Sequence, residues 1–204
     1  DIIFLCSPNN PTGTPLDIAV IEAVYEASRG MVIVDEAYWE FAPKDQRSAI
    51  TLLEGRPRLL VSRTMSKAFA FAGARVGYLA ADPAVIDALR LVRLPYHLSA
   101  LTQAAALAAL DHSAEMLGMV DEIVVQRDRI SATLTELGYT PLASWSNFVL
   151  FGGVADPALM WQELYDRGIL IRDVGIPGHL RVTAGTADET TAFLEALASI
   201  DSNA

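Results

Sequence analysis

The sequence predicts an α/β fold built on a mostly parallel sheet, followed by a smaller α+β unit. Short apolar segments alternate with helical patterns in the first half of the chain, which is typical of parallel strands joined by helices. The segments at 31–34 and 59–61 are apolar throughout, as expected for strands covered on both faces. After Gly138 the order of strand and helix patterns changes, and this change indicates the second unit.

The first half of the chain supplies four expected strands and one capped helix. Asp17 is placed to cap a helix that extends to Ser28, and Gly30 ends it. A turn rich in Asn, Pro and Gly precedes this helix at 8–15. The expected strands are residues 2–6, 31–34, 59–62 and 76–80.

Three helices and a change of pattern organise the rest of the chain. We expect helices at 82–93 and 100–110, and a longer one that begins at Ser113 and ends before Gly138. The expected domains are therefore residues 1–112, a connecting helix at 113–138, and a small domain at 139–204. In the small domain we expect strands at 148–151, 169–171 and 180–183 and helices at 156–166 and 187–200.

Composition excludes several classes of function. The 204 residues are 52% hydrophobic and 20% charged, which is typical of a globular protein with a real core. The net charge of −10, with no basic block, argues against nucleic-acid binding. The single cysteine, Cys6, excludes an intramolecular disulfide and favours the cytoplasm. The longest uncharged stretch near an expected helix, residues 94–110, is too polar to span a membrane.

Polar residues directly follow three of the expected strands. They are the pairs Asn9–Asn10 and Asp35–Glu36 and the segment Thr64–Lys67. Ligands of α/β sheets gather at the carboxyl ends of the strands, so we expect these residues at one edge of one sheet.

Lys67 lies among small hydroxyl residues, and Arg75 follows eight residues later. This pattern is poorly explained as a solvated surface charge. It suits an aldehyde cofactor with a phosphate group, because an amine can form a Schiff base while hydroxyls and a guanidinium bind phosphate. Arg75 could instead pair with one of the many acidic residues.

Asp35 and Asn10 each have two interpretations. A carboxylate at the end of a buried strand needs a partner, and a protonated ring nitrogen would serve. Asp35 could instead cap the next turn, and we interpret Glu36 beside it as structural or solvent-facing. Asn10 is explained as a turn residue by itself, but its position lets its amide donate to a cofactor oxygen.

Arg172 and Arg181 each lie within an apolar segment of the small domain. A single arginine in a strand is often an edge charge. Two that flank a loop rich in Gly and Pro, residues 174–178, could converge on an anionic substrate.

Other chemistries find little support. The histidines His97, His112 and His179 have no metal-ligand spacing with Cys6 or with carboxylates, so no metal site is expected. The serine-hydrolase motif G-x-S-x-G is absent, and Ser66 has no paired histidine.

Four ordered motifs resemble those of the fold-type-I pyridoxal-phosphate aminotransferases, and the resemblance covers residues 1 to about 200. They are Asn-Asn-Pro-Thr-Gly at 9–13, Asp-Glu-Ala-Tyr at 35–38, Thr-x-Ser-Lys at 64–67, and Arg75. Within this family, residues 169–173 and 179–185 are most similar to the histidinol-phosphate aminotransferases. The resemblance implies a three-layer large domain that binds pyridoxal 5'-phosphate and a small C-terminal domain.

The resemblance also implies roles for individual residues. Lys67 forms the Schiff base with the cofactor and moves the substrate proton, Asp35 keeps the ring nitrogen protonated, and Tyr38 and Asn10 bond the ring oxygen. Thr64, Ser66 and Arg75 hold the cofactor phosphate. Arg181 and Arg172 bind the carboxylate or phosphate of the substrate, and Tyr96 matches a position near the substrate phosphate.

The implied reaction is transamination between L-histidinol phosphate and 2-oxoglutarate in histidine biosynthesis, by a cytoplasmic homodimer. An aromatic amino acid aminotransferase, a threonine-phosphate decarboxylase and a non-catalytic sensor domain of the same fold are the alternatives. Because the chain begins directly at an expected strand and the family's N-terminal half has no counterpart here, we expect the chain to be the C-terminal part of a longer enzyme and to be inactive alone.

Overall fold

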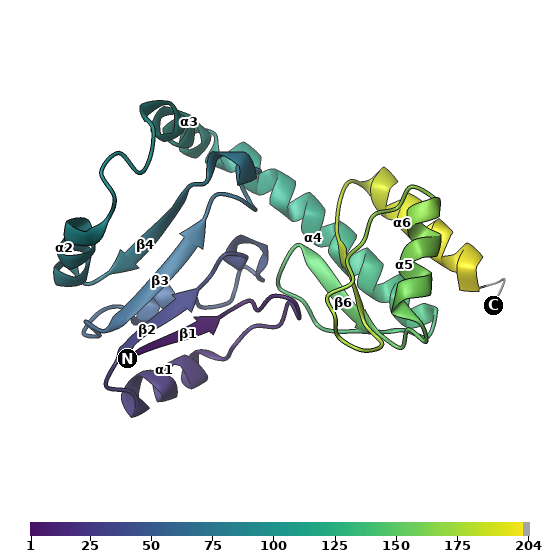
Figure 1. The fold of residues 1–204 in the computed structure, drawn as a ribbon, viewed down its shortest axis with the longest axis horizontal. Coiled ribbons are helices and arrows are strands. Elements are labelled where there is room, and N and C mark those ends of the chain that lie inside the picture. The colour runs from purple at the N-terminus through teal and green to yellow at the C-terminus, as the bar shows by residue number, and fades with distance from the viewer. Residues whose placement is uncertain (202–204) are drawn as a thin grey trace. The chain divides into compact units, whose positions relative to one another are not determined.

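The computed structural model describes residues 1–201, which form two compact units (Figure 1). Unit 1 comprises Asp1–Pro8 and Pro15–Met119, and unit 2 comprises Asn9–Thr14 and the chain from Val120 onward. The boundary between the units falls within the long helix α4 (Ser113–Glu136). The domain boundaries at 112 and 138 stay a prediction.

A four-stranded sheet forms the centre of unit 1 and confirms the expected mostly parallel arrangement (Figure 1). Strand β2 lies between β1 and β3 and is parallel to both, whereas β4 is antiparallel to β3. Each strand matches its expected position to within two residues. The strands are β1 (Ile2–Cys6), β2 (Met31–Asp35), β3 (Leu59–Thr64) and β4 (Gly77–Ala81).

The helices of unit 1 begin at the expected caps. Asp17 accepts a hydrogen bond from the Ala19 amide at 2.8 Å and starts α1 (Ile18–Ala27), and Ser99 caps α3 through the Thr102 amide at 3.0 Å. The other helices of the unit are α2 (Pro83–Val92), α3 (Ala100–Asp111) and the short helices η1 (Trp39–Phe41), η2 (Ala49–Leu52) and η3 (Ala72–Ala74).

One face of the sheet carries the core of unit 1. Ile21 and Tyr25 of α1 and Leu52 of η2 pack against it. Side chains alternate along a strand, so the odd-numbered residues of β3 and the even-numbered residues of β2 point into this covered face, and their neighbours point to the opposite face. The buried strand residues of the covered face are Val32, Val34, Leu59 and Val61.

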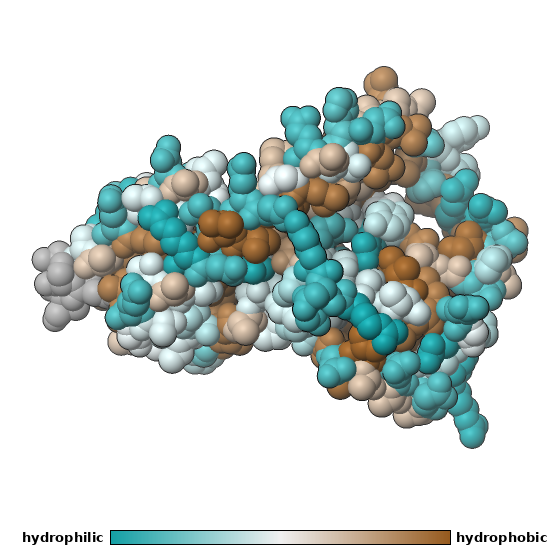
Figure 2. Space-filling view, turned by 180° about the vertical axis from the view of Figure 1, so that it is seen from behind, coloured by the Kyte–Doolittle hydropathy of each residue, from teal (hydrophilic) through white to brown (hydrophobic). Residues whose placement is uncertain are grey.

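Helices α2 and α3 contribute little to that core. No residue of α2 is buried. In α3, whose residues are all described, Ala106 is the one buried residue. Leu91 and Leu101 are 88% and 84% exposed. Figure 2 shows apolar surface over both helices. None of the helices in the described part of the chain is both long and apolar enough to cross a membrane.

Unit 2 packs helices against a three-stranded antiparallel sheet. Its core includes Leu134 of α4, Phe151 of β6 and Leu197 of α6, none of which is exposed. The elements that complete the unit are β5 (Thr140–Pro141), which the sequence did not predict, β6 (Phe148–Gly152), β7 (Leu180–Thr183), α5 (Pro157–Asp166) and α6 (Ala187–Asp201).

The expected strand at 169–171 is wrong. The amides of Gly168 and Ile169 donate to the carbonyls of Tyr165 and Leu164, which closes the C-terminal end of α5. These amides are therefore not available to a sheet. The segment pairs with β7 through a single bridge, between Arg172 and Arg181.

Truncating a core leucine of unit 2 should destabilise the protein far more than truncating an exposed one. Leu134→Ala leaves a cavity between α4 and the sheet, and we expect a loss of about 2–5 kcal/mol in the free energy of unfolding. Leu159→Ala, at a position that is 57% exposed, is the matched control and should cost less than about 0.5 kcal/mol. Chemical denaturation measures both values, and equal losses would contradict the assigned core.

Candidate active site

Lys67 lies at the end of a well-bonded turn that follows β3. The Met65 amide donates to the Val76 carbonyl at 3.0 Å, and the Thr64 hydroxyl accepts from the Ser66 amide at 3.1 Å. Lys67 itself is exposed, with its Nζ 5.5 Å from the centre of the Tyr38 ring. Within residues 1–201 this amine has no hydrogen bond and no carboxylate partner, so it is free to react.

Asp35 lies at the end of β2, and only one of its two carboxylate oxygens accepts hydrogen bonds from the described residues. Its Oδ1 accepts hydrogen bonds from the Ala37 amide at 3.1 Å and from the Ser62 hydroxyl at 3.3 Å. Its Oδ2 has no hydrogen-bond partner among the described residues, although the residue is half-buried. The two interpretations of Asp35 are therefore compatible, because one oxygen caps the turn and the other remains for a cationic group.

The structure brings Asp35, Tyr38 and Lys67 to the carboxyl edge of two adjacent strands. Asp35 pairs with Ser62 across β2 and β3, and the two turns that follow carry the other two side chains. Tyr38 is 7% exposed, so its ring is held in place while the lysine amine lies over it. A carboxylate, a tyrosine ring and an amine thus lie on two neighbouring turns of unit 1.

The other candidate residues of unit 1 differ in how firmly they are held. Arg75 adopts the left-handed conformation, with φ 57°, and one guanidinium nitrogen donates to the Ala72 carbonyl at 2.9 Å. The rest of its exposed guanidinium can bind another group. Ser66 is half-buried. Tyr96 lies between α2 and α3 and is 99% exposed, so its ring packs against almost nothing in the described part of the chain.

In unit 2, Arg181 contacts two other predicted residues, Asn10 through its side chain and Arg172 through its backbone. Its Nη1 donates to the Asn10 side-chain oxygen at 2.5 Å, and its guanidinium lies 4.6 Å from the centre of the Phe148 ring. Arg172 lies directly opposite Arg181, and their backbone groups exchange hydrogen bonds of 2.9 and 2.8 Å. Directly opposed residues of an antiparallel pair share a face, so the side chains of Arg172 and Arg181 leave the backbone on the same face.

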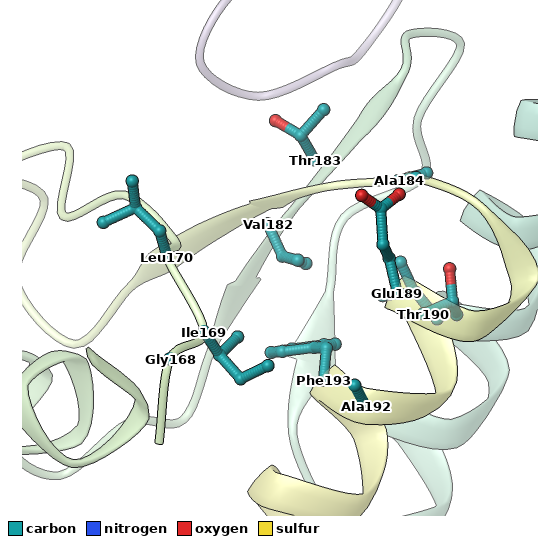
Figure 3. Close-up of a pocket in the computed structure, with 12 residues that line it drawn as sticks. Gly168, Ile169, Leu170, Val182, Thr183, Ala184, Glu189, Thr190, Ala192 and Phe193 are labelled. Atoms are coloured by element: carbon teal, nitrogen blue, oxygen red, sulfur yellow. The ribbon is translucent and has the colours of Figure 1, made fainter. Parts of the chain in front are cut away.

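A cavity of about 530 Å³ lies elsewhere in unit 2 (Figure 3). Ile169 and Leu170 approach it from the segment after α5, and Phe193 from α6, as Figure 3 shows. None of the predicted site residues lines it. Glu189 on its rim bonds the amide of Thr186, which lowers the pKa of this carboxyl group and caps α6. The candidate site is therefore the Lys67 cluster, which consists of Asp35, Tyr38 and Lys67, and this cavity is separate from it.

Sequence reasoning missed a buried ionic cluster beside the Lys67 cluster. Glu36 is 1% exposed and bonded to Arg63 and Ser48, so it is structural and the solvent-facing alternative is wrong. A signal was present, because Glu36 and Arg63 continue the alternation of the buried residues of β2 and β3. Among residues 1–201, no three His, Cys, Asp or Glu side chains group as metal ligands would.

The family model for aminotransferase class I and II matches residues 1–197. This chain belongs to the class I and II aminotransferase family. The match covers both units and includes every residue of the Lys67 cluster and the two arginines of unit 2.

Several curated relatives of this aminotransferase chain are histidinol-phosphate aminotransferases. One from Paenarthrobacter aurescens is 66% identical over 98% of this chain and 55% of its own length. Another, from Streptomyces avermitilis, is 56% identical over 97% of this chain and 54% of its own length. The chain thus spans about half the length of the curated relatives it matches.

A solved structure confirms the fold of this aminotransferase chain. Histidinol-phosphate aminotransferase from Sinorhizobium meliloti, in complex with pyridoxal-5'-phosphate, matches with a TM-score of 0.86 and 30% identity. The match covers 99% of this chain and 57% of the other. The α/β architecture expected from the sequence is therefore correct.

Proposed function

We propose that the protein transfers the amino group of L-histidinol phosphate to 2-oxoglutarate, which yields imidazole-acetol phosphate and L-glutamate in histidine biosynthesis. The observation that carries this proposal is the 66% identity to a histidinol-phosphate aminotransferase over 98% of the chain. The free amine of Lys67 beside Tyr38 and the available oxygen of Asp35 supply the chemistry that a transaminase needs.

The donor set of unit 1 fits pyridoxal 5'-phosphate. The cofactor needs an amine for its aldehyde, an anion for its ring nitrogen and donors for its phosphate, and Lys67, Asp35 and Arg75 offer these groups. When bound, the cofactor draws electron density away from the substrate Cα. The hydroxyls of Ser66 and Thr64 complete the proposed phosphate contacts, although the Thr64 hydroxyl also stabilises its own turn.

Lys67 and Asp35 have complementary tasks in this proposal. The Nζ of Lys67 would hold the cofactor before substrate arrives, and the same amine would then take the proton from the substrate Cα and deliver it to the C4′ carbon of the cofactor. Asp35 Oδ2 would keep a proton on the ring nitrogen, because an anion beside that nitrogen favours its charged form. The phenol of Tyr38 orients the ring through its oxygen. Asn10 contributes to the same oxygen through its amide N–H, since its carbonyl oxygen accepts from Arg181.

The arginines of unit 2 supply the anion site. We propose that Arg181 binds the carboxylate of glutamate and, with Arg172, the phosphate of histidinol phosphate. A planar guanidinium matches both groups with paired hydrogen bonds. The contacts of Arg181 with Phe148 and Asn10 support this role because they hold the fork in one orientation. Tyr96 is proposed to contact the same phosphate.

We further propose that the protein acts as a cytoplasmic homodimer. The exposed apolar residues of α2, of α3 and of the segment between them support a partner, because Leu91, Val92, Leu94 and Leu101 are each at least 75% exposed. Contiguous apolar surface of this kind marks protein–protein contacts.

Substrate comparison tests the proposed reaction. In the protein as encoded by its natural gene, turnover with histidinol phosphate should exceed turnover with phenylalanine. Preference for phenylalanine would favour the aromatic alternative, and release of carbon dioxide from threonine phosphate would favour the decarboxylase. Absence of turnover and of cofactor binding would favour the non-catalytic alternative.

Arg181→Gln should raise the KM for both phosphate and carboxylate substrates, and we expect kcat/KM to fall by about 100-fold because a charge-assisted, paired contact is lost. The matched control is Arg167→Gln, which removes an exposed arginine bonded only to a helix carbonyl in the same unit. Equal kinetics in the two variants would contradict the assigned anion site.

A further inference from the structure

Two turns of unit 1 must keep a fixed separation if the proposed function is correct. The Asp35 turn, residues 35–38, carries the carboxylate and the phenol, and the Lys67 turn, residues 64–67, carries the amine. The two turns follow adjacent parallel strands, whose last pairing is between Asp35 and Ser62. Beyond that pair, the Glu36 amide donates to the Ser62 carbonyl at 2.9 Å, and the pairing of the two strands ends there.

A buried ion pair connects the two turns on the other face of the sheet. Oε2 of Glu36 accepts from Arg63 Nη2 at 2.8 Å and from Arg63 Nε at 3.1 Å. The two side chains are 1% and 14% exposed. Glu36 directly follows Asp35, and Arg63 directly precedes Thr64. Each partner is therefore one residue from a residue of the proposed site, while its own side chain points into the covered face.

The pair is fixed further by the first residue of η2 and by Ser48, which precedes it. Glu36 accepts hydrogen bonds from the Ala49 amide at 2.6 Å and from the Ser48 hydroxyl at 2.7 Å. Arg63 Nη2 also donates to the Ser48 oxygen at 2.9 Å. Both oxygens of Glu36 are thus satisfied, and Ser48 bonds both members of the pair.

A second carboxylate, that of Glu40, forms an ion pair with the same arginine, Arg63. Glu40 Oε1 is 3.5 Å from Arg63 Nη1, and its Oε2 is buried without a hydrogen-bond partner among the described residues. Burial raises the pKa of the Glu40 carboxyl group. Burial alone would lower the pKa of Arg63, but the hydrogen bond and charge of Glu36 outweigh it and raise that pKa. Arg63 therefore stays charged and bonded to Glu36.

A stability role alone explains this arrangement poorly. Desolvation of the two charges offsets much of their attraction. Apolar residues of similar size in place of a buried ion pair often give a protein equal or greater stability. What an ion pair adds is directional geometry, because the guanidinium fork accepts a carboxylate in few orientations.

We propose that Glu36 and Arg63 are positioning residues that set the separation between Asp35 and Lys67. They touch neither cofactor nor substrate. Their bonds hold the Asp35 turn against the Lys67 turn from the covered face. The carboxylate and the amine therefore keep the spacing at which both can contact one cofactor molecule. This inference rests on the proposed function for its purpose, but the coupling of the two turns belongs to the chain itself.

Amide hydrogen exchange without cofactor tests the coupling. Two amides report on the turns, namely Ala37, bonded to Asp35 Oδ1, and Ser66, bonded to Thr64 Oγ1. In Glu36→Gln and Arg63→Lys we expect both amides to exchange about tenfold faster, because the turns open locally. The Val32 amide in the centre of the sheet should keep its rate, which shows that the protein stays folded.

The matched control is Glu22→Gln. It breaks the ion pair between Glu22 and Arg56, also at 2.8 Å, which lies outside both turns. It should leave the exchange of Ala37 and Ser66 unchanged. If Arg63→Lys or Glu36→Gln does not fold, Ser48→Ala replaces them, since it removes one bond to each partner and should give a smaller change in the same direction.

A second readout separates positioning from stability. With pyridoxal 5'-phosphate bound, the pH midpoint of the visible absorbance should shift in Glu36→Gln and Arg63→Lys, and kcat per bound cofactor should fall about tenfold or more, since misplacement of about 1 Å is costly. Glu22→Gln should change neither value.

Unchanged amide exchange in both pair variants would overturn the inference. So would faster exchange with an unchanged midpoint and kcat, because the pair would then be structural only. If the unsubstituted protein forms no borohydride-reducible complex with the cofactor, the proposed function fails, and the exchange experiment still decides whether the pair couples the turns.

Discussion

Lys67→Ala is expected to abolish the visible absorbance that borohydride removes and to lower kcat by at least about 10⁴-fold, because no other group can replace a covalent amine. The sequence provides a natural control, since it contains two lysines, Lys44 and Lys67. Lys44→Ala should keep both the absorbance and the turnover. Absorbance spectroscopy and steady-state kinetics measure the two effects.

Borohydride reduction followed by peptide mass analysis gives an independent check. The cofactor mass should appear on the peptide that contains Lys67. Its appearance on Lys44, or a reducible band that survives in Lys67→Ala, would show that the Schiff-base lysine is wrongly assigned.

Asp35→Ala is expected to separate turnover from cofactor binding. We expect kcat to fall by at least about 100-fold, since a preorganised charge beside the reacting group is lost. Cofactor content should stay within about twofold, because the phosphate contacts proposed for Arg75 and Ser66 remain. The turnover rate at saturating substrate, followed by absorbance, measures kcat, and a cofactor assay measures the cofactor content.

Two further variants interpret that result. Asp45→Asn removes an exposed carboxylate after η1 and should change neither quantity. Asp35→Asn keeps the size and one hydrogen-bond acceptor but removes the charge, so it should resemble Asp35→Ala. Near-normal turnover in Asp35→Asn would assign Asp35 to turn capping alone.

The regular elements of the chain were readable from local patterns. Asp17 and Ser99 were predicted as helix caps, and each accepts the expected amide hydrogen bond. Strands β1, β2 and β3 were predicted from apolar runs, because burial of a parallel sheet leaves little choice of residue. The positions of Asp35 and Lys67 at one edge followed from the ends of those strands.

One local prediction failed because the same segment could either join a sheet or close the end of a helix. Residues 169–171 are as apolar as a strand, yet Gly168 and Ile169 bond the end of α5 instead. A periodic pattern records burial but does not say which backbone partner satisfies the amides.

Sequence by itself predicted the candidate residues and determined the sheet edge on which Asp35 and Lys67 lie, because residue types and strand ends are local properties. Tertiary structure alone decided how Glu36 and Arg63 are used. Their bond spans 27 positions of the sequence, and only the pairing of β2 with β3 brings a buried carboxylate to a buried guanidinium. The same holds for Arg181 and Asn10, which are 171 positions apart and meet within unit 2. Pairwise contacts of this kind depend on the packing of whole elements, which no local pattern encodes.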